Sequence, residues 1–422
     1  MRAFPPASVI ASMSSATDPR VDSSERADVV VLGASFAGIE VVLQLARRTE
    51  GRGLSMIVID RQSEHGYIPL VQEHLCENTN EDTARLDTRA FVDSLPNARF
   101  VQGEVVGLDL ETKTVRLASG TTVSGRFIVV ALGSELAPPP ELPGREHLLS
   151  HKGRAGFDRA KAALDQALRG ETPPSVVVIG GGISGIELAA ELGALRDTRP
   201  AAWTQAPKVT LVSSGDRLAP ELTAGVGRRA EQVLHGLDVD VRVDTRVQAV
   251  TEAAVVVRAK GETAELTYDL AFWAGGVRPA AILDALGLPR TEDGWLAVGP
   301  TLQCFPTPVP TRSDIFACGD AVRIVGGDGR WPTMQRAIEC LWQAKVVARN
   351  IHTLSKRPAD YPEGVPPLRP HRLRESFYYG VSLGPRSLVV RGPLVVDLPG
   401  INHWFRRFLM RQYFARYAPL RG

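Results

Sequence analysis

The sequence predicts an α/β fold built on two similar βαβ units, the second inserted within the first. Two segments, 28–40 and 175–192, each start with an apolar run, continue with small residues in a G-x-[GS]-x-x-G rhythm and lead into a helical pattern. The apolar runs, 29–32 and 176–179, are typical of central parallel strands that are buried on both faces. The length of 422 residues also exceeds one ordinary core, which favours two or three domains.

The small residues of these segments predict a Rossmann-like dinucleotide-binding unit in each. The first glycine allows a tight turn from strand to helix, the second position lets the backbone approach a pyrophosphate, and the third lets the helix pack on the strand. The helix N-terminus then offers free N–H groups to the phosphates. These positions are Gly33, Ser35 and Gly38 in the first unit and Gly180, Gly182 and Gly185 in the second. Ordinary glycine turns are the alternative, and two complete patterns in one chain disfavour it.

An acidic residue follows the next strand of the first unit. The apolar run 56–59 ends at Asp60, where a carboxylate can accept hydrogen bonds from both ribose hydroxyls of an adenosine. A surface cap after the strand is the alternative. The complete βαβ context favours ribose binding.

Composition and charge exclude several classes of protein. The formal net charge of +2 and the lack of a basic, aromatic strip argue against nucleic acid as a partner. No apolar run approaches the roughly 18 residues that cross a bilayer. The four cysteines form no C-x-x-C pair and the eight histidines show no ligand spacing, so no metal site is expected. We therefore expect a cytoplasmic protein, with peripheral attachment to the cytoplasmic face of a membrane left open.

Polar and Pro-rich segments divide the chain into domains. The Ser-, Ala- and Pro-rich residues 1–27 are expected to form a disordered leader. The expected domains are a first unit split over 28–150 and 269–355, a second unit over 151–268, and a C-terminal module over 371–422. Helical patterns lie at 39–48, 156–169, 185–195 and 334–354, strands at 126–132, 208–212 and 314–320, and hairpins at 238–260.

Together these patterns resemble the two-dinucleotide-binding-domain flavoproteins of the pyridine nucleotide-disulfide oxidoreductase superfamily. Within it, the chain is most similar to the type II NADH dehydrogenases, which are NAD(P)H:quinone oxidoreductases of the membrane surface. The matching motifs are HGYIPLVQEHL at 65–75, VVALGS at 129–134, FWAGGVRP at 272–279 and CGDA at 318–321. The resemblance covers nearly the whole chain after the leader.

The resemblance implies FAD as the cofactor and NAD(P)H as the co-substrate. The first glycine loop then holds the FAD pyrophosphate, Asp60 its ribose, and the second loop NAD(P)H. The further FAD contacts that the resemblance implies are Pro69 and Leu70 at the isoalloxazine, Gly133 and Gly276 in two turns, and Asp320 and Ala321, with Asp320 on the ribityl chain. Glu187 is expected close to the nicotinamide. Its alternative role is to complement the dipole of its own helix.

One departure from the family pattern concerns the choice between NADH and NADPH. The strand 208–212 ends at Ser213 and Ser214 rather than at the acidic residue that selects NADH. Serines tolerate a 2′-phosphate, and Arg217 is near enough in sequence to pair with it. NADPH or mixed use is therefore expected, and loss of tight nicotinamide binding is the alternative.

A second departure lies in the quinone-site pattern A-Q-x-A-x-Q, which falls on residues 334–339. Gln335 is kept, and Glu339 replaces the second Gln. Because residues four apart share a helix face, both are predicted to line one acceptor pocket. A solvated helix face is the alternative.

The C-terminal residues 401–417 predict an amphipathic helix. Apolar side chains recur at Ile401, Trp404, Phe405, Phe408 and Leu409, and Arg406 and Arg407 fall opposite them. From residue 401 onward there are five arginines and no acidic residue, which suits an anionic membrane surface. Docking within the chain, or a homodimer contact, is the alternative.

The resemblance thus implies an FAD-dependent oxidoreductase that takes hydride from NAD(P)H and passes electrons to a quinone-type acceptor. Cys318 and Cys340 show no evident partner, which disfavours sulfide oxidation and disulfide reduction. Two alternatives stay open, namely a tailoring oxidoreductase for a quinone-like or aromatic metabolite and a slow redox sensor that binds both nucleotides.

Overall fold

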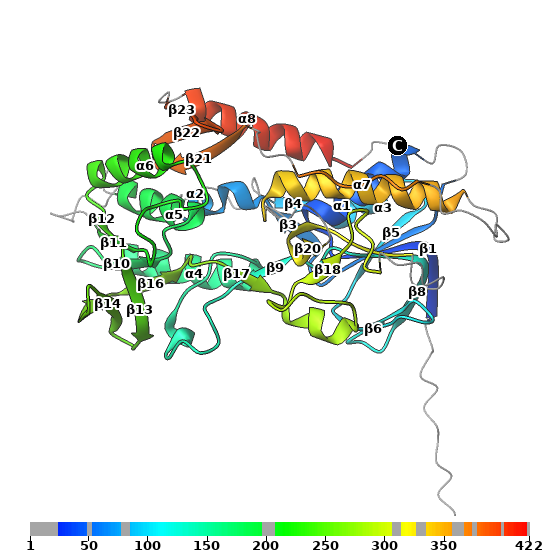
Figure 1. The fold of residues 1–422 in the computed structure, drawn as a ribbon, viewed down its shortest axis with the longest axis horizontal. Coiled ribbons are helices and arrows are strands. Elements are labelled where there is room, and N and C mark those ends of the chain that lie inside the picture. Colours follow the sequence, from blue (N-terminus) through cyan, green and yellow to red (C-terminus); the bar gives the residue numbers. More distant parts are fainter. Residues whose placement is uncertain are drawn as a thin grey trace, which may run out of the picture.

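The chain forms two lobes that lie side by side, with a C-terminal layer that runs across both (Figure 1). The computed structural model describes residues 24–48, 53–76, 85–195, 207–305, 314–325, 335–356, 367–373, 378–397 and 401–419, with side chains from residue 404 in the last segment. Most of the leader lies outside these residues.

The first lobe is built on a seven-stranded sheet of order β5-β2-β1-β8-β7-β6, with β19 paired to β8. Its strands are β1 (Ser24–Leu32), β2 (Met56–Asp60), β5 (Ala98–Gln102), β6 (Val105–Asp109), β7 (Thr114–Leu117), β8 (Thr122–Val130) and β19 (Ile315–Ala317). Strands β5, β2, β1, β8 and β19 run parallel. The run 29–32 is fully buried, as expected for a central strand covered on both faces.

Helices cover this sheet, and shorter elements connect it to the rest of the lobe. Helices α1 (Phe36–Arg48) and α7 (Ala337–Ser355) pack against each other (Figure 1). The shorter elements are β3 (Glu64–Gly66), η1 (Ile68–Leu70), α2 (Val71–Cys76), β4 (Arg85–Asp87), α3 (Thr88–Asp93), η3 (Arg145–His147), η5 (Ala281–Leu286), β18 (Leu296–Val298), η6 (Gly319–Ala321) and β20 (Val322–Ile324).

Strand β1 starts earlier than the sequence suggested. Residues 24–27, assigned to the disordered leader, pair in parallel with β8, from Ser24 opposite Thr122 to Ala27 opposite Gly125. Three of these four residues are polar, so no apolar pattern marked the strand in the sequence. Backbone pairing with a neighbouring strand needs no such pattern.

The second lobe repeats the same plan with a four-stranded parallel sheet of order β12-β11-β10-β16. Its elements are α4 (Arg154–Leu168), β10 (Ser175–Ile179), α5 (Ile183–Ala194), β11 (Lys208–Val212), α6 (Ala224–Gly236), β12 (Asp240–Arg242), β13 (Thr245–Val250), β14 (Ala254–Ala259), β15 (Glu262–Thr267) and β16 (Leu270–Trp273). The predicted α/β fold with two such units is confirmed.

Two strands fall differently from their sequence assignment. β16 pairs with β10, so it lies in the second sheet and not in the first lobe, where a division at residue 269 would put it. β12 joins β11 in parallel, so only β13, β14 and β15 form the antiparallel hairpins expected over 238–260. The two connections between the lobes pair with each other, as β9 (Ser134–Leu136) and β17 (Val277–Pro279).

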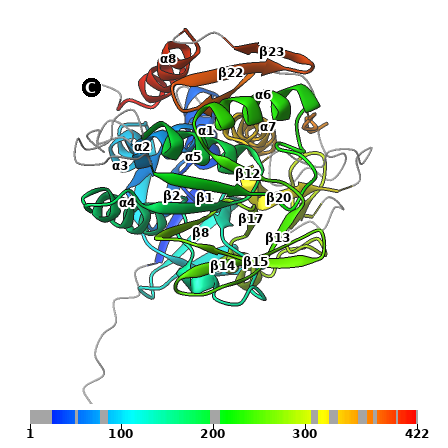
Figure 2. The ribbon, with the colours of Figure 1, turned by 90° about the vertical axis from the view of Figure 1, so that its left-hand side faces the viewer.

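The C-terminal module consists of a three-stranded sheet and one helix. Its elements are β21 (Tyr379–Leu383), β22 (Arg386–Arg391), β23 (Leu394–Asp397) and α8 (Ile401–Arg416). Figure 2 shows this sheet above α5 and α6, which in turn cover the parallel sheet of the second lobe. The turn at Gly384 packs closely on α5, because a Cβ there would lie 2.9 Å from the Ala190 carbonyl oxygen.

Helix α8 is attached to the first lobe through a buried carboxylate on α1. Glu40 is fully buried and accepts hydrogen bonds from Arg416 Nε (3.0 Å), Arg416 Nη2 (2.6 Å) and the Tyr417 hydroxyl (2.6 Å). A charged group in this position is costly unless it is paired, so the contact fixes how the last turns of α8 lie.

Candidate functional site

The first glycine loop has the close packing that its sequence predicted. Gly33 has φ +99°, and a Cβ there would lie 2.4 Å from the Ala131 carbonyl oxygen. A Cβ at Gly38 would lie 1.8 Å from the Gly33 carbonyl oxygen, so the helix can approach the turn only without a side chain. The two glycines therefore bring the loop backbone close to the strand and the helix at the start of α1.

Asp60 lies at the end of β2, beside this loop. Its Oδ2 accepts a hydrogen bond from the Ala34 N–H (2.7 Å) and its Oδ1 one from the Gln62 N–H (2.9 Å). Each carboxylate oxygen has further lone pairs, so a ribose can still bind. Ribose binding by Asp60 stays a prediction, and the structure adds that this side chain also fixes the loop.

The second glycine loop repeats this geometry. A Cβ at Gly180, whose φ is +131°, would lie 2.3 Å from the Ala274 carbonyl oxygen, and one at Gly185 would lie 1.8 Å from the Gly180 carbonyl oxygen. Gly182 differs, because a Cβ there would meet only Glu221 Oε1, at 3.6 Å. The same Glu221 oxygen accepts a hydrogen bond from the Ile183 N–H (3.0 Å), so an anion already lies at the N-terminus of α5, where a pyrophosphate is expected.

The end of β11 carries the residues expected to choose between NADH and NADPH. Ser213 is buried, and its Oγ accepts a hydrogen bond from the Gly215 N–H (3.3 Å), whereas Ser214 is exposed. The Arg217 guanidinium donates to carbonyl oxygens of its own loop, among them Pro220 (2.7 Å) and Leu222 (3.0 Å). Contact of Ser213 and Arg217 with a 2′-phosphate stays a prediction, and Ser214, unlike Ser213, is open to solvent.

A polar cluster surrounds Asp320 in the CGDA turn. Asp320 Oδ2 accepts hydrogen bonds from Ser134 Oγ (3.1 Å) and Lys152 Nζ (3.2 Å), and its Oδ1 accepts one from Cys340 Sγ (3.5 Å). Gln335 Nε2 donates to the Asp320 carbonyl oxygen (3.3 Å). Side chains from the connection β9 (Ser134), from the start of the second unit (Lys152) and from the second half of the split first unit (Cys340) thus meet at one carboxylate.

The surroundings of this turn fit a bound organic group. Gly133 and Gly276 have φ values of +71° and +121°, and apart from each glycine and its chain neighbours no described residue lies within 4 Å of where their Cβ atoms would be. Two buried polar atoms, His151 Nδ1 and Glu339 Oε2, have no hydrogen-bond partner among the residues described. His151 precedes Lys152, and Glu339 precedes Cys340, so both lie next to partners of Asp320 in the chain. Open backbone and buried polar atoms with spare hydrogen-bonding capacity suit the approach of a polar organic group.

The predicted pairing of Gln335 and Glu339 on one helix face is wrong. Helix α7 begins at Ala337, and Arg336 before it is extended, so Gln335 lies outside the helix. The rule that residues four apart share a helix face therefore does not apply to Gln335 and Glu339. Glu339 is fully buried and its Oε1 lies 2.6 Å from His371 Nε2 and 3.2 Å from Gln343 Nε2. Gln343 Oε1 in turn accepts the Gly319 N–H (2.7 Å), which connects Glu339 to the Asp320 turn.

Glu187 belongs to a buried carboxylate cluster under the C-terminal sheet. Its Oε1 accepts the Ser382 N–H (2.8 Å), and Glu191 Oε1 accepts the Ser382 hydroxyl (2.8 Å). Burial raises the pKa of Glu187 and that of Glu191 to about 7, against the opposing charge of Arg406 on α8, and Glu73 on α2 raises both further. The proximity of Glu187 to a nicotinamide stays a prediction.

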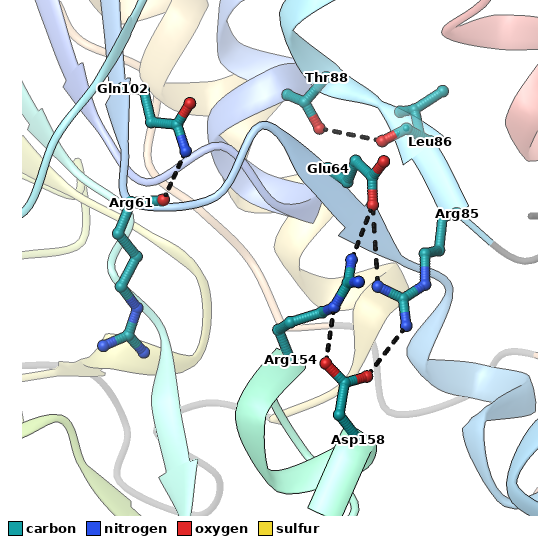
Figure 3. A network of polar contacts seen from close by, with 8 residues as sticks. All are labelled: Arg61, Glu64, Arg85, Leu86, Thr88, Gln102, Arg154 and Asp158. Atoms are coloured by element: carbon teal, nitrogen blue, oxygen red, sulfur yellow. Dashed lines mark hydrogen bonds and ion pairs between the residues drawn. The ribbon is translucent and has the colours of Figure 1, made fainter. Parts of the chain in front are cut away.

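The segment around Pro69 and Leu70 is held by α8 and by ion pairs. Leu70 is buried, and Arg406 Nη2 donates to the Pro69 carbonyl oxygen (3.0 Å). Upstream, Glu64 on β3 pairs with Arg154 (3.0 Å) and Arg85 (3.7 Å), and Asp158 on α4 pairs with the same two arginines (Figure 3). Partly exposed pairs contribute little singly, but four charges in one network restrict how β3 can move.

Sequence reasoning missed several residues that the fold brings to the site. Ser134 and Lys152 hold Asp320, His371 pairs with Glu339, and Arg406 holds Pro69. None lies in a recognisable spacing, since each contact joins distant parts of the chain. The one signal in the sequence that could have found any of them is a polar residue within or beside a recognised motif, as at Ser134.

Two glycine loops of this geometry, with the Asp320 turn of the first unit beside the connection between the lobes, define a protein of the two-dinucleotide class. The chain belongs to the pyridine nucleotide-disulphide oxidoreductase family, whose sequence profile matches residues 27–344. The resemblance inferred from the motifs is thereby confirmed.

Relatives of known name are similar over most of the chain. A type II NADH:quinone oxidoreductase of Haemophilus influenzae is 25% identical over 368 residues, which cover 78% of this chain and 80% of that protein. The demethylphylloquinone reductase NdbB of Synechocystis is 26% identical, over 72% of this chain and 73% of that protein. Fe-regulated protein 8 of Mycosarcoma maydis is 27% identical, over 93% and 98% of the two chains.

Solved structures share the fold. NDH2 from Plasmodium falciparum, solved in complex with NADH, superposes with a TM-score of 0.77 over 93% of this chain and 96% of that one, at 13% identity. The sulfide:quinone oxidoreductase of Aquifex aeolicus superposes with a TM-score of 0.74 over 93% and 91% of the two chains, at 17% identity. At these identities the likeness supports the arrangement of lobes and C-terminal module alone.

The buried carboxylate cluster predicts that stability falls as pH rises. A carboxyl whose pKa is raised from 4.5 to about 7 binds its proton more tightly in the folded state, so its contribution is complete below pH 4.5 and is lost as pH rises through 7. The loss is on the order of 3 kcal/mol for each carboxyl. Urea unfolding between pH 5.5 and 8.5 should show Glu191→Gln losing less stability than the wild type. Glu262→Gln, an exposed position, should follow the wild-type profile, and an unchanged Glu191→Gln profile would contradict the cluster.

The exposed Ser214 predicts how the coenzyme preference can be changed. Ser214→Glu should lower kcat/KM for NADPH about tenfold or more and leave NADH little changed, because a carboxylate at the end of the second strand repels a 2′-phosphate. The rate of flavin reduction with each coenzyme measures the effect. Ser214→Gln, of equal size and no charge, is the control. Equal losses with both coenzymes would place the 2′-position elsewhere.

Proposed function

We propose that this chain is an FAD-dependent oxidoreductase that transfers hydride from NAD(P)H to the flavin and then electrons to a quinone-type acceptor. The observation that carries the proposal is the pair of glycine loops whose first and third glycines pack in the same way, which supports two dinucleotide sites in one chain. The relatives from Haemophilus influenzae and Synechocystis are named as reductases of quinones, which supports this class of acceptor.

The residues of the first lobe divide between the two ends of FAD. Gly33, Ser35, Gly38 and Asp60 hold the pyrophosphate and ribose, and Pro69, Leu70, Gly133, Gly276, Asp320 and Ala321 the flavin end. The bound flavin supplies the redox chemistry, because it accepts a hydride and gives up electrons to a second substrate. The protein supplies position and charge, and the fixed Asp320 carboxylate is suited to accept hydrogen bonds from the ribityl hydroxyls.

The residues of the second lobe bind NAD(P)H. Gly180, Gly182 and Gly185 bring the backbone of the loop to the pyrophosphate, and Ser213, Ser214 and Arg217 line the turn at the adenosine ribose. Glu221 competes with the pyrophosphate for the N-terminus of α5, so it must move when the coenzyme binds. Glu187 lies in the first half of the same helix, α5, where it accepts a hydrogen bond from the C-terminal sheet.

Glu339 and His371 are suited to supply a proton to the acceptor. Two-electron reduction of a quinone to a quinol consumes two protons, and one of them comes with the hydride. The Glu339 and His371 side chains share one buried hydrogen bond of 2.6 Å. The Gln343 side chain connects this pair to the Asp320 turn, because it donates to Glu339 and accepts a hydrogen bond from the Gly319 N–H. A buried acid–base pair can hold one proton and release it without opening to solvent.

The cysteines do not support thiol chemistry. All four cysteines are buried. Burial raises the pKa of the Cys318 thiol to about 12, and the pKa of Cys340 is raised well above its usual range, with Asp320 adding to the effect of burial. A thiol that stays protonated is a poor nucleophile, so disulfide or sulfide substrates are disfavoured.

The outer face of α8 is suited to a membrane surface. Trp404 and Phe408 are stacked at 5.6 Å and are 62% and 39% exposed, and Phe405 and Leu409 beside them are exposed too. No described helix is long and apolar enough to cross a bilayer. Aromatic side chains beside arginines favour a peripheral site at an anionic bilayer surface, next to the apolar interior in which a lipophilic quinone dissolves.

The proposed reaction predicts two separable half-reactions. Anaerobic NAD(P)H should bleach the flavin absorbance, and a short-chain quinone should restore it. Glu339→Gln should slow the restoration by quinone about tenfold or more and leave bleaching unchanged, since only the quinone step needs the proton. Ferricyanide, which accepts electrons without protons, is the control and should reoxidise the variant at the wild-type rate.

Other outcomes separate the alternatives. An absence of bleaching with either coenzyme would refute the proposal. Bleaching followed by a long-lived reduced state with every quinone would favour the redox sensor, and restoration by one aromatic metabolite alone would favour the tailoring enzyme.

The exposed stripe predicts binding to anionic vesicles. The double variant Trp404→Ala/Phe408→Ala should lose most co-sedimentation with phosphatidylglycerol vesicles, because it removes the largest exposed rings of α8. Val106→Ala, an exposed apolar position on β6, is the control. If the wild type does not bind vesicles but forms a dimer that the double variant cannot form, the stripe is a subunit contact instead.

A further inference from the structure

We propose that His65 and Tyr413 are positioning residues for the FAD pyrophosphate, so that the C-terminal helix α8 is part of the FAD site. The inference rests on the proposed function in that it takes the first glycine loop as the FAD loop. It adds a role for two side chains outside that loop, one of them nearly 380 residues further along the chain.

A continuous chain of hydrogen bonds joins the phosphate loop to α8. Ser35 occupies the second small position of the glycine rhythm, and its Oγ lies 3.1 Å from His65 Nδ1. The other ring nitrogen, Nε2, lies 2.9 Å from the Tyr413 hydroxyl. The imidazole therefore bridges the loop that faces the pyrophosphate and the inner face of the last helix.

The His65 ring is held in one orientation. It is 6% exposed, and Phe36, the residue after Ser35, packs edge-on against it with ring centroids 4.5 Å apart at 82°. Tyr67 and Tyr413 close the cluster, with their ring centroids 5.1 Å apart. Upstream, the ion pairs of Glu64 fix the strand that carries His65 (Figure 3). A ring packed on several sides cannot turn to follow a displaced partner.

The chemistry of the chain fixes its direction. Burial lowers the pKa of His65 to about 3, so the ring is neutral at ordinary pH and one nitrogen donates while the other accepts. A phosphate oxygen only accepts, so Ser35 must use its hydroxyl hydrogen on the phosphate and accept from His65 Nδ1–H. His65 Nε2 must then accept from the Tyr413 hydroxyl, whose pKa is raised well above its usual range by burial, so it keeps its proton. Tyr413 thereby selects the tautomer that aims the Ser35 hydroxyl at the pyrophosphate.

The helix has other attachments that leave this chain of bonds undisturbed. Arg416 and Tyr417 hold Glu40 on α1, and Arg406 holds the Pro69 carbonyl oxygen. These contacts keep α8 in place when the Tyr413 hydroxyl alone is removed. Tyr417 is therefore a matched control, since it is also a tyrosine of the α8 end with a buried hydrogen bond to the first lobe, but without a bond to the loop.

A double-mutant cycle on FAD affinity tests the proposal. The dissociation constant is measured by titrating FAD into the deflavinated full-length chain and following the fluorescence of the flavin. Tyr413→Phe should weaken FAD binding about tenfold, because the buried His65 Nε2 loses its donor and the Ser35 hydroxyl loses its orientation. In the Ser35→Ala background, Tyr413→Phe should cause little further loss, because the hydroxyl that it orients is absent. Tyr417→Phe should bind FAD as the wild type does.

Each outcome decides between the proposal and its failure. Equal weakening by Tyr417→Phe, an unchanged affinity in Tyr413→Phe, or a full tenfold loss in the Ser35→Ala background would overturn the role of Tyr413. If Tyr413→Phe fails to fold, as judged by circular dichroism of the deflavinated chain, the Ser35→Ala variant decides, since a wild-type FAD affinity there would also overturn the chain of bonds. A wild-type chain that does not bind FAD would instead refute the proposed function.

Discussion

The structure depends on a contact between two glycines that occurs twice. In each lobe, the third glycine of the loop approaches the carbonyl oxygen of the first so closely that a Cβ would lie 1.8 Å away. This approach brings α1 onto β1 and α5 onto β10, and it places a loop of mostly small residues at the start of each helix. Because the contact admits no side chain at all, it fixes the helix, the strand and the nucleotide loop of each lobe together.

The sequence predicted the parts of the fold that local chemistry decides. The apolar runs 29–32 and 176–179 became central strands, and β11 has the predicted bounds Lys208–Val212. Errors arose where tertiary contacts decide, as at the start of α7. The residue before that helix, Arg336, is extended, so the helix cannot begin earlier. The Gln335 side chain donates a hydrogen bond to the Asp320 carbonyl oxygen and does not continue the helical pattern. Helix starts depend on such contacts, and residue spacing alone does not reveal them.

The sequence predicted the glycines of the candidate site and the acidic residues beside them, such as Asp60 and Asp320, but it missed the side chains that hold those acids in place. The glycines could be predicted because a tight turn or a close backbone approach requires a residue without a side chain, and that requirement is visible in the local sequence. Lys152, His371 and Tyr413 matter only through partners more than 15 residues away, at Asp320, Glu339 and His65. Ser213 shows the converse error, because its place at the strand end was predicted correctly but its hydroxyl faces inward.

Helix α8 inverts the usual arrangement of an amphipathic helix on a protein. Its inner face carries Arg406, Tyr413 and Arg416, which bind buried carbonyl, imidazole and carboxylate groups, and its apolar stripe faces outward. Exposed aromatic area is unfavourable in water, so the inner contacts, both polar and through the buried rings of Tyr413 and Tyr417, must hold the helix in place. Of these contacts, the one made by Tyr413 reaches the phosphate loop through His65. The proposed FAD contact and the proposed surface contact therefore share one helix, and any coupling between them must be reciprocal.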